Sequence, residues 1–189
     1  MSQISIDAPL AYQPLSRSAD AGLRAGTDIV APPAGPTPVP PSTDELIDLI
    51  ELGYHNVHRR ELPELIRLAK RVERAHSAHP ANPRGIVALL EQMRGELEAH
   101  MLKEESVLFP MMRRGGHPLI AQPIGAMLVE HDDHSELLRE LERITGYFAV
   151  PDDACPTWRA LCAGARRFAD NVAEHIHMEN DILFPRFGG

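Results

Sequence analysis

Two stretches of the chain share a histidine and a glutamate followed by the tripeptide Leu-Phe-Pro. His100 and Glu104 stand four positions apart in the first stretch, and His175 and Glu179 repeat the arrangement in the second. On a helix, residues four apart lie on one face, so each pair can present an imidazole and a carboxylate together. Imidazole nitrogens and carboxylate oxygens are common ligands of first-row transition metals. The chemistry that this pattern favours is metal binding.

A pair of histidines precedes each copy of the pattern. His55 and His58 come before the first copy, and His131 and His134 come before the second at nearly the same distance. The whole unit is therefore duplicated, and it supplies imidazoles and carboxylates related by an approximate two-fold axis. We interpret this as a ligand set for two metal ions. Within each early pair, spacing leaves open which histidine is a ligand and which orients the ligands.

The donor types indicate which metal the site would hold. If both glutamates bridge, each ion receives two imidazoles and one oxygen from each carboxylate, which leaves two positions of an octahedral ion for other ligands. One suits a solvent-derived oxo or hydroxo bridge, and the other suits a small exogenous ligand. Because thiolates are absent from the set, iron or manganese is favoured over structural zinc, and we expect iron. Glu96 and Glu130 are candidates for an acidic shell around the site, for a path of metal exchange or for a solvated face.

Composition excludes several other classes of protein. The chain has 19 Lys and Arg against 27 Asp and Glu, a net charge of -8, so a nucleic-acid partner is disfavoured. No apolar run is long enough for a membrane span, and the first ten residues do not resemble a signal peptide, so we expect a cytoplasmic protein. The two cysteines, Cys155 and Cys162, are expected to be small core residues rather than a disulfide or a zinc site.

The elements that must position these side chains are helices. Residues 1–41 are rich in proline and are expected to form a flexible leader before a single domain at 42–189. Ser42 with Glu45 predicts a capping box at the start of the first helix. Apolar spacing and breaker residues predict four helices at about 43–76, with a bend near Pro63, 84–113, 120–148 and 156–185. We therefore predict an all-α, up-down-up-down four-helix bundle with the site between facing helices.

The motifs also resemble those of a known family. They are His55-x2-His58-Arg59-x-Glu61-Leu62-Pro63, His100-Met101-x-Lys103-Glu104-Glu105, Leu108-Phe109-Pro110, Glu130-His131-Asp132 and His175-x3-Glu179-Asn180. In order and spacing they closely resemble the hemerythrin-like domain of the repair-of-iron-centres proteins of the YtfE and ScdA type. The resemblance implies a hemerythrin-like four-helix bundle with a non-haem di-iron centre. It also implies six ligands, with both glutamates bridging: His55, His100, Glu104, His131, His175 and Glu179.

The same resemblance implies a function in nitrosative and oxidative stress. Such proteins support the repair of damaged iron–sulfur clusters, and donation of iron to damaged or apo iron–sulfur proteins is the leading hypothesis. The alternatives are a hemerythrin-like sensor or carrier that binds NO or O2 reversibly, and an enzyme that reduces NO to N2O at the di-iron site. Family members commonly carry an N-terminal domain with adjacent cysteines, whereas residues 1–41 contain no cysteine, so functions that need those thiols are not expected.

Overall fold

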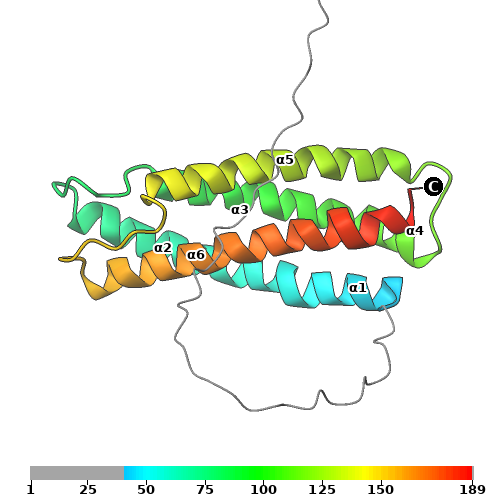
Figure 1. Cartoon of the computed structure of the whole chain (residues 1–189), viewed down its shortest axis with the longest axis horizontal. Coiled ribbons are helices and arrows are strands. Elements are labelled where there is room, and N and C mark those ends of the chain that lie inside the picture. The colour runs from blue at the N-terminus through cyan, green and yellow to red at the C-terminus, as the bar shows by residue number, and fades with distance from the viewer. Residues whose placement is uncertain (1–40, 189) are drawn as a thin grey trace, which may run out of the picture.

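Residues 41–188 are described by a computed structural model, in which every regular element is a helix (Figure 1). Four long helical rods run side by side, and short connections join consecutive rods. The predicted all-α four-helix bundle is confirmed. The predicted flexibility of residues 1–41 concerns a segment that, apart from Pro41, lies outside the described residues.

Several of the rods are built from more than one helical segment. The first rod comprises α1, the π-helix η1 and α2, and the second rod comprises α3, the π-helix η2 and α4. The third rod is α5 alone. The fourth rod comprises α6, the π-helix η3 and the 3-10 turn η4. Their bounds are α1 Thr43–Leu49, η1 Ile50–His55, α2 Asn56–Ala75, α3 Ile86–Lys103, η2 Glu104–Leu108, α4 Phe109–Arg113, α5 Ala121–Ile144, α6 Pro156–His177, η3 Met178–Leu183 and η4 Phe184–Arg186.

The first rod begins as the sequence predicts. Glu45 donates its backbone N–H to the Ser42 hydroxyl at 3.2 Å, and the Glu45 carboxylate accepts the Ser42 N–H at 2.7 Å, which completes the capping box. Helix α2 continues through Pro63. The rod departs from α geometry earlier, at Ile50–His55, where the chain is π-helical.

The third rod is shorter than predicted, because α5 ends at Ile144 rather than near residue 148. The Thr145 hydroxyl donates to the Leu141 carbonyl and accepts the N–H of Phe148, and this closes the helix. Tyr147 and Phe148 then adopt positive φ angles of 60° and 62°. Such angles are unfavourable for these residues, but burial of the Phe148 ring, which is 7% exposed, holds the turn against the core.

Two hydrophobic clusters fill the interior of the bundle. The larger one lies among α2, α3, α5 and α6 and includes Leu62, Leu138 and Phe168. The smaller one gathers the Leu-Phe-Pro ends of the second and fourth rods, with Phe109 and Phe184. Along each rod the candidate ligands fall where one cluster gives way to the other. The site is therefore enclosed by apolar side chains at both ends.

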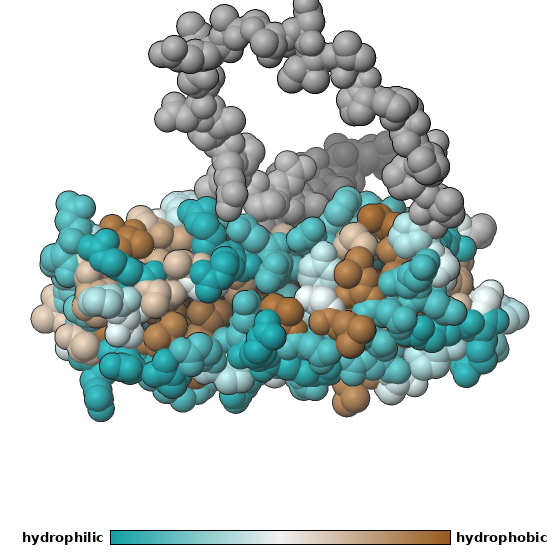
Figure 2. Space-filling model, turned by 90° about the horizontal axis from the view of Figure 1, so that it is seen from below, coloured by the Kyte–Doolittle hydropathy of each residue, from teal (hydrophilic) through white to brown (hydrophobic). Residues whose placement is uncertain are grey.

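Figure 2 shows one face on which hydrophilic residues predominate and hydrophobic residues appear in separate patches. Within residues 41–188, no helix combines the length and apolar character needed to cross a bilayer. Both cysteines are free thiols, and they lie in or against the larger cluster, as predicted.

Candidate metal centre

The six residues that the family resemblance implied as ligands come together in the middle of the bundle. They form two groups in which one ligand atom from each residue lies within 4.8 Å of the others. The first group contains His55 and His175, and the second contains His100 and His131. Glu104 and Glu179 belong to both groups. All six side chains are buried, with exposed fractions of 0–1%.

Each glutamate lies between the two groups. Glu104 approaches the Nε2 atoms of His55 and His100 at 3.4 Å each, so it contacts one histidine of each group. Glu179 approaches Nε2 of His131 at 3.0 Å and Nε2 of His175 at 3.3 Å, again one from each group. Both carboxylates are therefore placed to bridge two neighbouring positions.

These distances fit ligands that share an ion. Ligand atoms about 2.1 Å from one ion lie about 3.0 Å apart at right angles and about 3.4 Å apart at tetrahedral angles. The Nε2 atoms are 3.2 Å apart in the pair His55 and His175, and 3.1 Å apart in the pair His100 and His131. Within residues 41–188, imidazole nitrogens are the close partners of the two buried glutamates, and no lysine or arginine pairs with them. Buried carboxylates require a cationic partner, so the donor set fits metal ions.

Three π-helical segments carry residues of the site. His55 is the last residue of η1, Glu104 is the first of η2, and Glu179 is the second of η3. A π turn widens the helix by one residue and rotates the side chains relative to an α-helix. The π segments thus set the direction of three of the six side chains.

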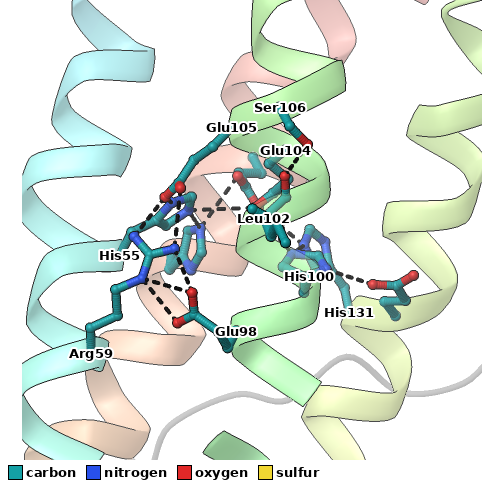
Figure 3. Close-up of polar contacts among 12 residues, drawn as sticks. His55, Arg59, Glu98, His100, Leu102, Glu104, Glu105, Ser106 and His131 are labelled. Atoms are coloured by element: carbon teal, nitrogen blue, oxygen red, sulfur yellow. Dashed lines mark hydrogen bonds and ion pairs between the residues drawn. The ribbon is translucent and has the colours of Figure 1, made fainter. Parts of the chain in front are cut away.

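A charged network supports the imidazole of His55 (Figure 3). Nδ1 of His55 lies 2.7 Å from the Glu105 carboxylate. Arg59 donates to both oxygens of Glu105, at 2.8 and 3.1 Å, and also to Glu98. The hydrogen bond to Glu105 fixes the ring so that Nε2 points into the centre. The sequence interpretation quoted Arg59 and Glu105 only as motif residues and did not assign this supporting role to them or to Glu98.

Two other candidate ligands have partners at Nδ1. For His100 the partner is Glu130, at 3.0 Å, and Lys103 donates to the other oxygen of that carboxylate. For His131 the partner is the side-chain oxygen of Asn180, at 2.7 Å. Asn180 follows Glu179 just as Glu105 follows Glu104, and this alignment of the two copies is the signal that could have found both.

Aromatic rings cover the imidazoles from outside the centre. Phe109 stacks on His55 and Phe184 stacks on His131, each with ring centroids 5.8 Å apart. The Leu-Phe-Pro segments therefore contribute packing at one end of the site. The ring of Tyr54 stacks on His175, the fourth candidate histidine, with ring centroids 5.6 Å apart.

His58 and His134 are buried beside the centre but belong to neither group. The ring of His58 lies 5.4 Å from that of His175, and the ring of His134 lies 4.8 Å from that of His100. Burial, with help from the neighbouring imidazoles, lowers the pKa of His58 to about 2 and that of His134 to about 3. Both are neutral at physiological pH.

Two histidines inside the groups, His100 and His55, behave differently, whereas burial lowers the pKa of His175. Burial opposes a positive charge on His100. The hydrogen bond to Glu104 and the negative charge of that carboxylate favour it, and together with Glu179 and Glu130 they raise the pKa of His100 to about 9. The pKa of His55 is raised against the same effect of burial by Glu104 and Glu105. A metal ion that binds here must displace these protons, because imidazole ligates in its deprotonated form.

Glu96 and Glu130 have separate places in the structure. Glu130 is the partner of His100, whereas Glu96 accepts a hydrogen bond from Gln92 on the surface. Both line a surface pocket of about 380 Å³ between α3 and α5, which also reaches His134. The exposed His177, by contrast, pairs with Asp181 away from the site.

A duplicated four-helix bundle that buries four histidines and two shared glutamates is a metal-binding bundle of the hemerythrin type. The chain belongs to the hemerythrin HHE cation binding domain family, whose sequence profile matches residues 50–187. Domains of this family bind metal cations. The family resemblance read from the motifs is confirmed.

Several curated proteins are similar to this chain. "Iron-sulfur cluster repair protein DnrN" of Neisseria gonorrhoeae is 46% identical over 101 residues, which cover 53% of this chain and 64% of the relative. "Iron-sulfur cluster repair protein YtfE" of Enterobacter sp. (strain 638) is 44% identical over 142 residues, 75% of this chain and 64% of the relative. A "Probable iron-sulfur cluster repair protein" of Haemophilus influenzae is 44% identical over 102 residues, 54% of this chain and 46% of the relative. The chain thus matches less than two thirds of the length of each.

Proposed function

We propose that the centre holds two iron ions, with both glutamates bridging. The ligands would be His55, His100, Glu104, His131, His175 and Glu179. The observation that carries this proposal is that two groups of ligand atoms share the same two buried carboxylates. Imidazole and carboxylate donors without thiolate favour iron over structural zinc.

The protein would fill only some of the coordination positions of each ion. Its residues offer two imidazoles and two carboxylate oxygens to each position, fewer than the six ligands of an octahedral ion. Two adjacent iron ions, when bound, supply exchangeable iron and redox chemistry, and the remaining positions suit small ligands such as NO or O2. The apolar clusters at both ends keep bulk water from the centre. Glu105, Glu130 and Asn180 hold the imidazoles in the orientation that ligation needs.

We infer that this chain supports the repair of damaged iron–sulfur clusters in the cytoplasm under nitrosative or oxidative stress. The support comes from the names of its relatives and from incomplete ligation, which suits an ion that must be given up. In this role iron is the cargo, delivered to a damaged or apo iron–sulfur protein. The pocket beside Glu130 and His134 offers a polar way between the surface and the neighbourhood of the centre.

The proposal is tested by iron transfer. The reduced, iron-loaded chain is incubated with an apo iron–sulfur enzyme and sulfide, and recovery of that enzyme's activity is followed. We expect recovery with the wild type and none with Glu104→Ala, which lacks one shared carboxylate. No recovery with the iron-loaded wild type would contradict donation. Reversible NO or O2 binding without iron loss would instead assign a sensor or carrier, and N2O formation would assign NO reduction.

A further inference from the structure

One candidate ligand lacks the support that the other three have. His55, His100 and His131 each direct Nδ1 at an oxygen, within 2.7–3.0 Å. Among residues 41–188, no such partner faces Nδ1 of His175, whose polar contacts are made through Nε2. A neutral imidazole that ligates through Nε2 carries its proton on Nδ1, and metal-bound histidines almost always donate that proton to an acceptor.

The neighbouring His58 has the complementary deficiency. Its side chain is fully buried, and neither ring nitrogen has a hydrogen-bond partner within the described part of the chain. Buried polar atoms without partners cost free energy and are rare in folded proteins. Rings of Tyr54, Phe168 and His175 surround it, at centroid distances of 6.5, 5.7 and 5.4 Å. Of these three rings only that of His175 contains nitrogen, and its Nδ1 is the one that needs an acceptor.

We propose that His58 is the positioning residue of His175 and accepts the Nδ1–H of His175 through one solvent molecule. This inference rests on the proposed metal centre. It gives His58 a role distinct from that of a ligand. With His58 as acceptor, each of the four candidate imidazole ligands has a hydrogen-bond partner for Nδ1. It also explains why a polar side chain stands at a position enclosed by aromatic rings.

The duplication provides a matched control. His134 corresponds to His58 in the second copy and lies against His100, at 4.8 Å. His100 already has Glu130 as its acceptor. Loss of the His134 imidazole therefore leaves the support of His100 in place, although both histidines are buried and equally close to a candidate ligand.

The test measures metal affinity in the full chain. Wild type, His58→Leu, His58→Gln, His134→Leu and Glu105→Leu are loaded with Co²⁺, and affinity is measured by chelator competition together with the visible spectrum. We expect His58→Leu to weaken binding of one ion by about 10- to 100-fold and to change the spectrum. His58→Gln, which retains an acceptor, should recover most of the affinity, and His134→Leu should stay within about threefold of the wild type.

Two outcomes would overturn the inference. One is wild-type affinity in His58→Leu, and the other is an equal loss in His134→Leu. Circular dichroism shows whether His58→Leu folds, and if it does not, His58→Gln decides the test. A loss of metal affinity in folded His58→Gln as large as that in Glu105→Leu would also contradict the role of His58 as an acceptor. If the wild type binds no metal, the proposed centre itself is wrong. If the wild type binds two ions and substitution of His58 leaves their affinity unchanged, only this inference is rejected.

Discussion

The charges that support His55 occur in one copy of the duplicated unit and not in the other. In the first copy, Arg59, which also pairs with Glu98, donates to the carboxylate of Glu105, and this carboxylate in turn fixes His55. Aligning the copies places neutral residues at all three positions of the second: Ser135, Ala173 and Asn180. The two metal positions of the proposed centre are therefore not equivalent, although their ligand types are the same.

This asymmetry predicts an effect of Arg59 that is transmitted through Glu105. In Arg59→Met the Glu105 carboxylate loses the two hydrogen bonds donated by Arg59, and it no longer holds His55 in one orientation. We expect metal affinity to fall by about 10-fold, as measured by chelator competition. Arg67→Met is the control, since Arg67 pairs on the surface with Glu64 and has no contact with the site. Equal affinities for the two variants would show that the network has no part in metal binding.

The sequence could reveal candidate ligands but not their support. Histidine and glutamate recur at fixed spacing because the unit is duplicated, so four of the six residues that converge could be named from spacing, and the family resemblance implied His55 and His131. Their role as ligands stays a prediction. Arg59 and Glu98 are far apart in the chain and meet across α2 and α3, and no local pattern encodes such a contact. Spacing also could not decide between His55 and His58, because both lie on the same helical face.

At the level of the elements, the four predicted helices agree with the structure to within a few residues except at the end of α5. Apolar periodicity and breaker residues suffice for this, because each rod has one face in the core. The π segments were not predicted, since one extra residue per turn changes the apolar pattern too little to be seen. The end of α5 depends on Thr145 and on burial of Phe148, which are tertiary effects.

Two glycines test how closely α6 packs on α2. A Cβ atom added at Gly164 would lie 2.8 Å from Cδ2 of Leu65, a buried residue of α2, whereas one added at Gly95 meets nothing within 4 Å. We expect Gly164→Ala to lower the free energy of unfolding by about 1 kcal/mol or more, because overpacking outweighs the gain in helix propensity. Gly95→Ala should raise it by up to about 1 kcal/mol. Urea denaturation measures both, and stabilisation by Gly164→Ala would refute the close approach.

At the scale of the whole molecule, the centre connects all four rods. Each rod contributes at least one of the six residues, and the two hydrophobic clusters meet at the layer in which they lie. An ion bound to the native state alone adds to its stability by mass action. Metal binding in this bundle is therefore coupled to its folding, within the single domain proposed for residues 42–189.

Metal removal should accordingly lower the melting temperature. At a free metal concentration 100 times the dissociation constant, one site contributes about 2.7 kcal/mol. We expect calorimetry to show a clear downward shift when a chelator is added to the wild type, and no shift for Glu104→Ala, which cannot complete either group. A chelator-induced shift of equal size in both proteins would mean that the stabilising metal lies elsewhere.

The most direct measurement is the iron content of the purified chain and of variants in the shared carboxylates. Because Glu104 and Glu179 each belong to both ligand groups, loss of either should affect both ions. We expect about two iron ions per wild-type chain and almost none in Glu104→Ala or Glu179→Ala, while the exposed His177→Ala keeps the wild-type content. Zinc alone in the wild type, or undiminished iron in either glutamate variant, would contradict a centre of two iron ions bridged by these carboxylates.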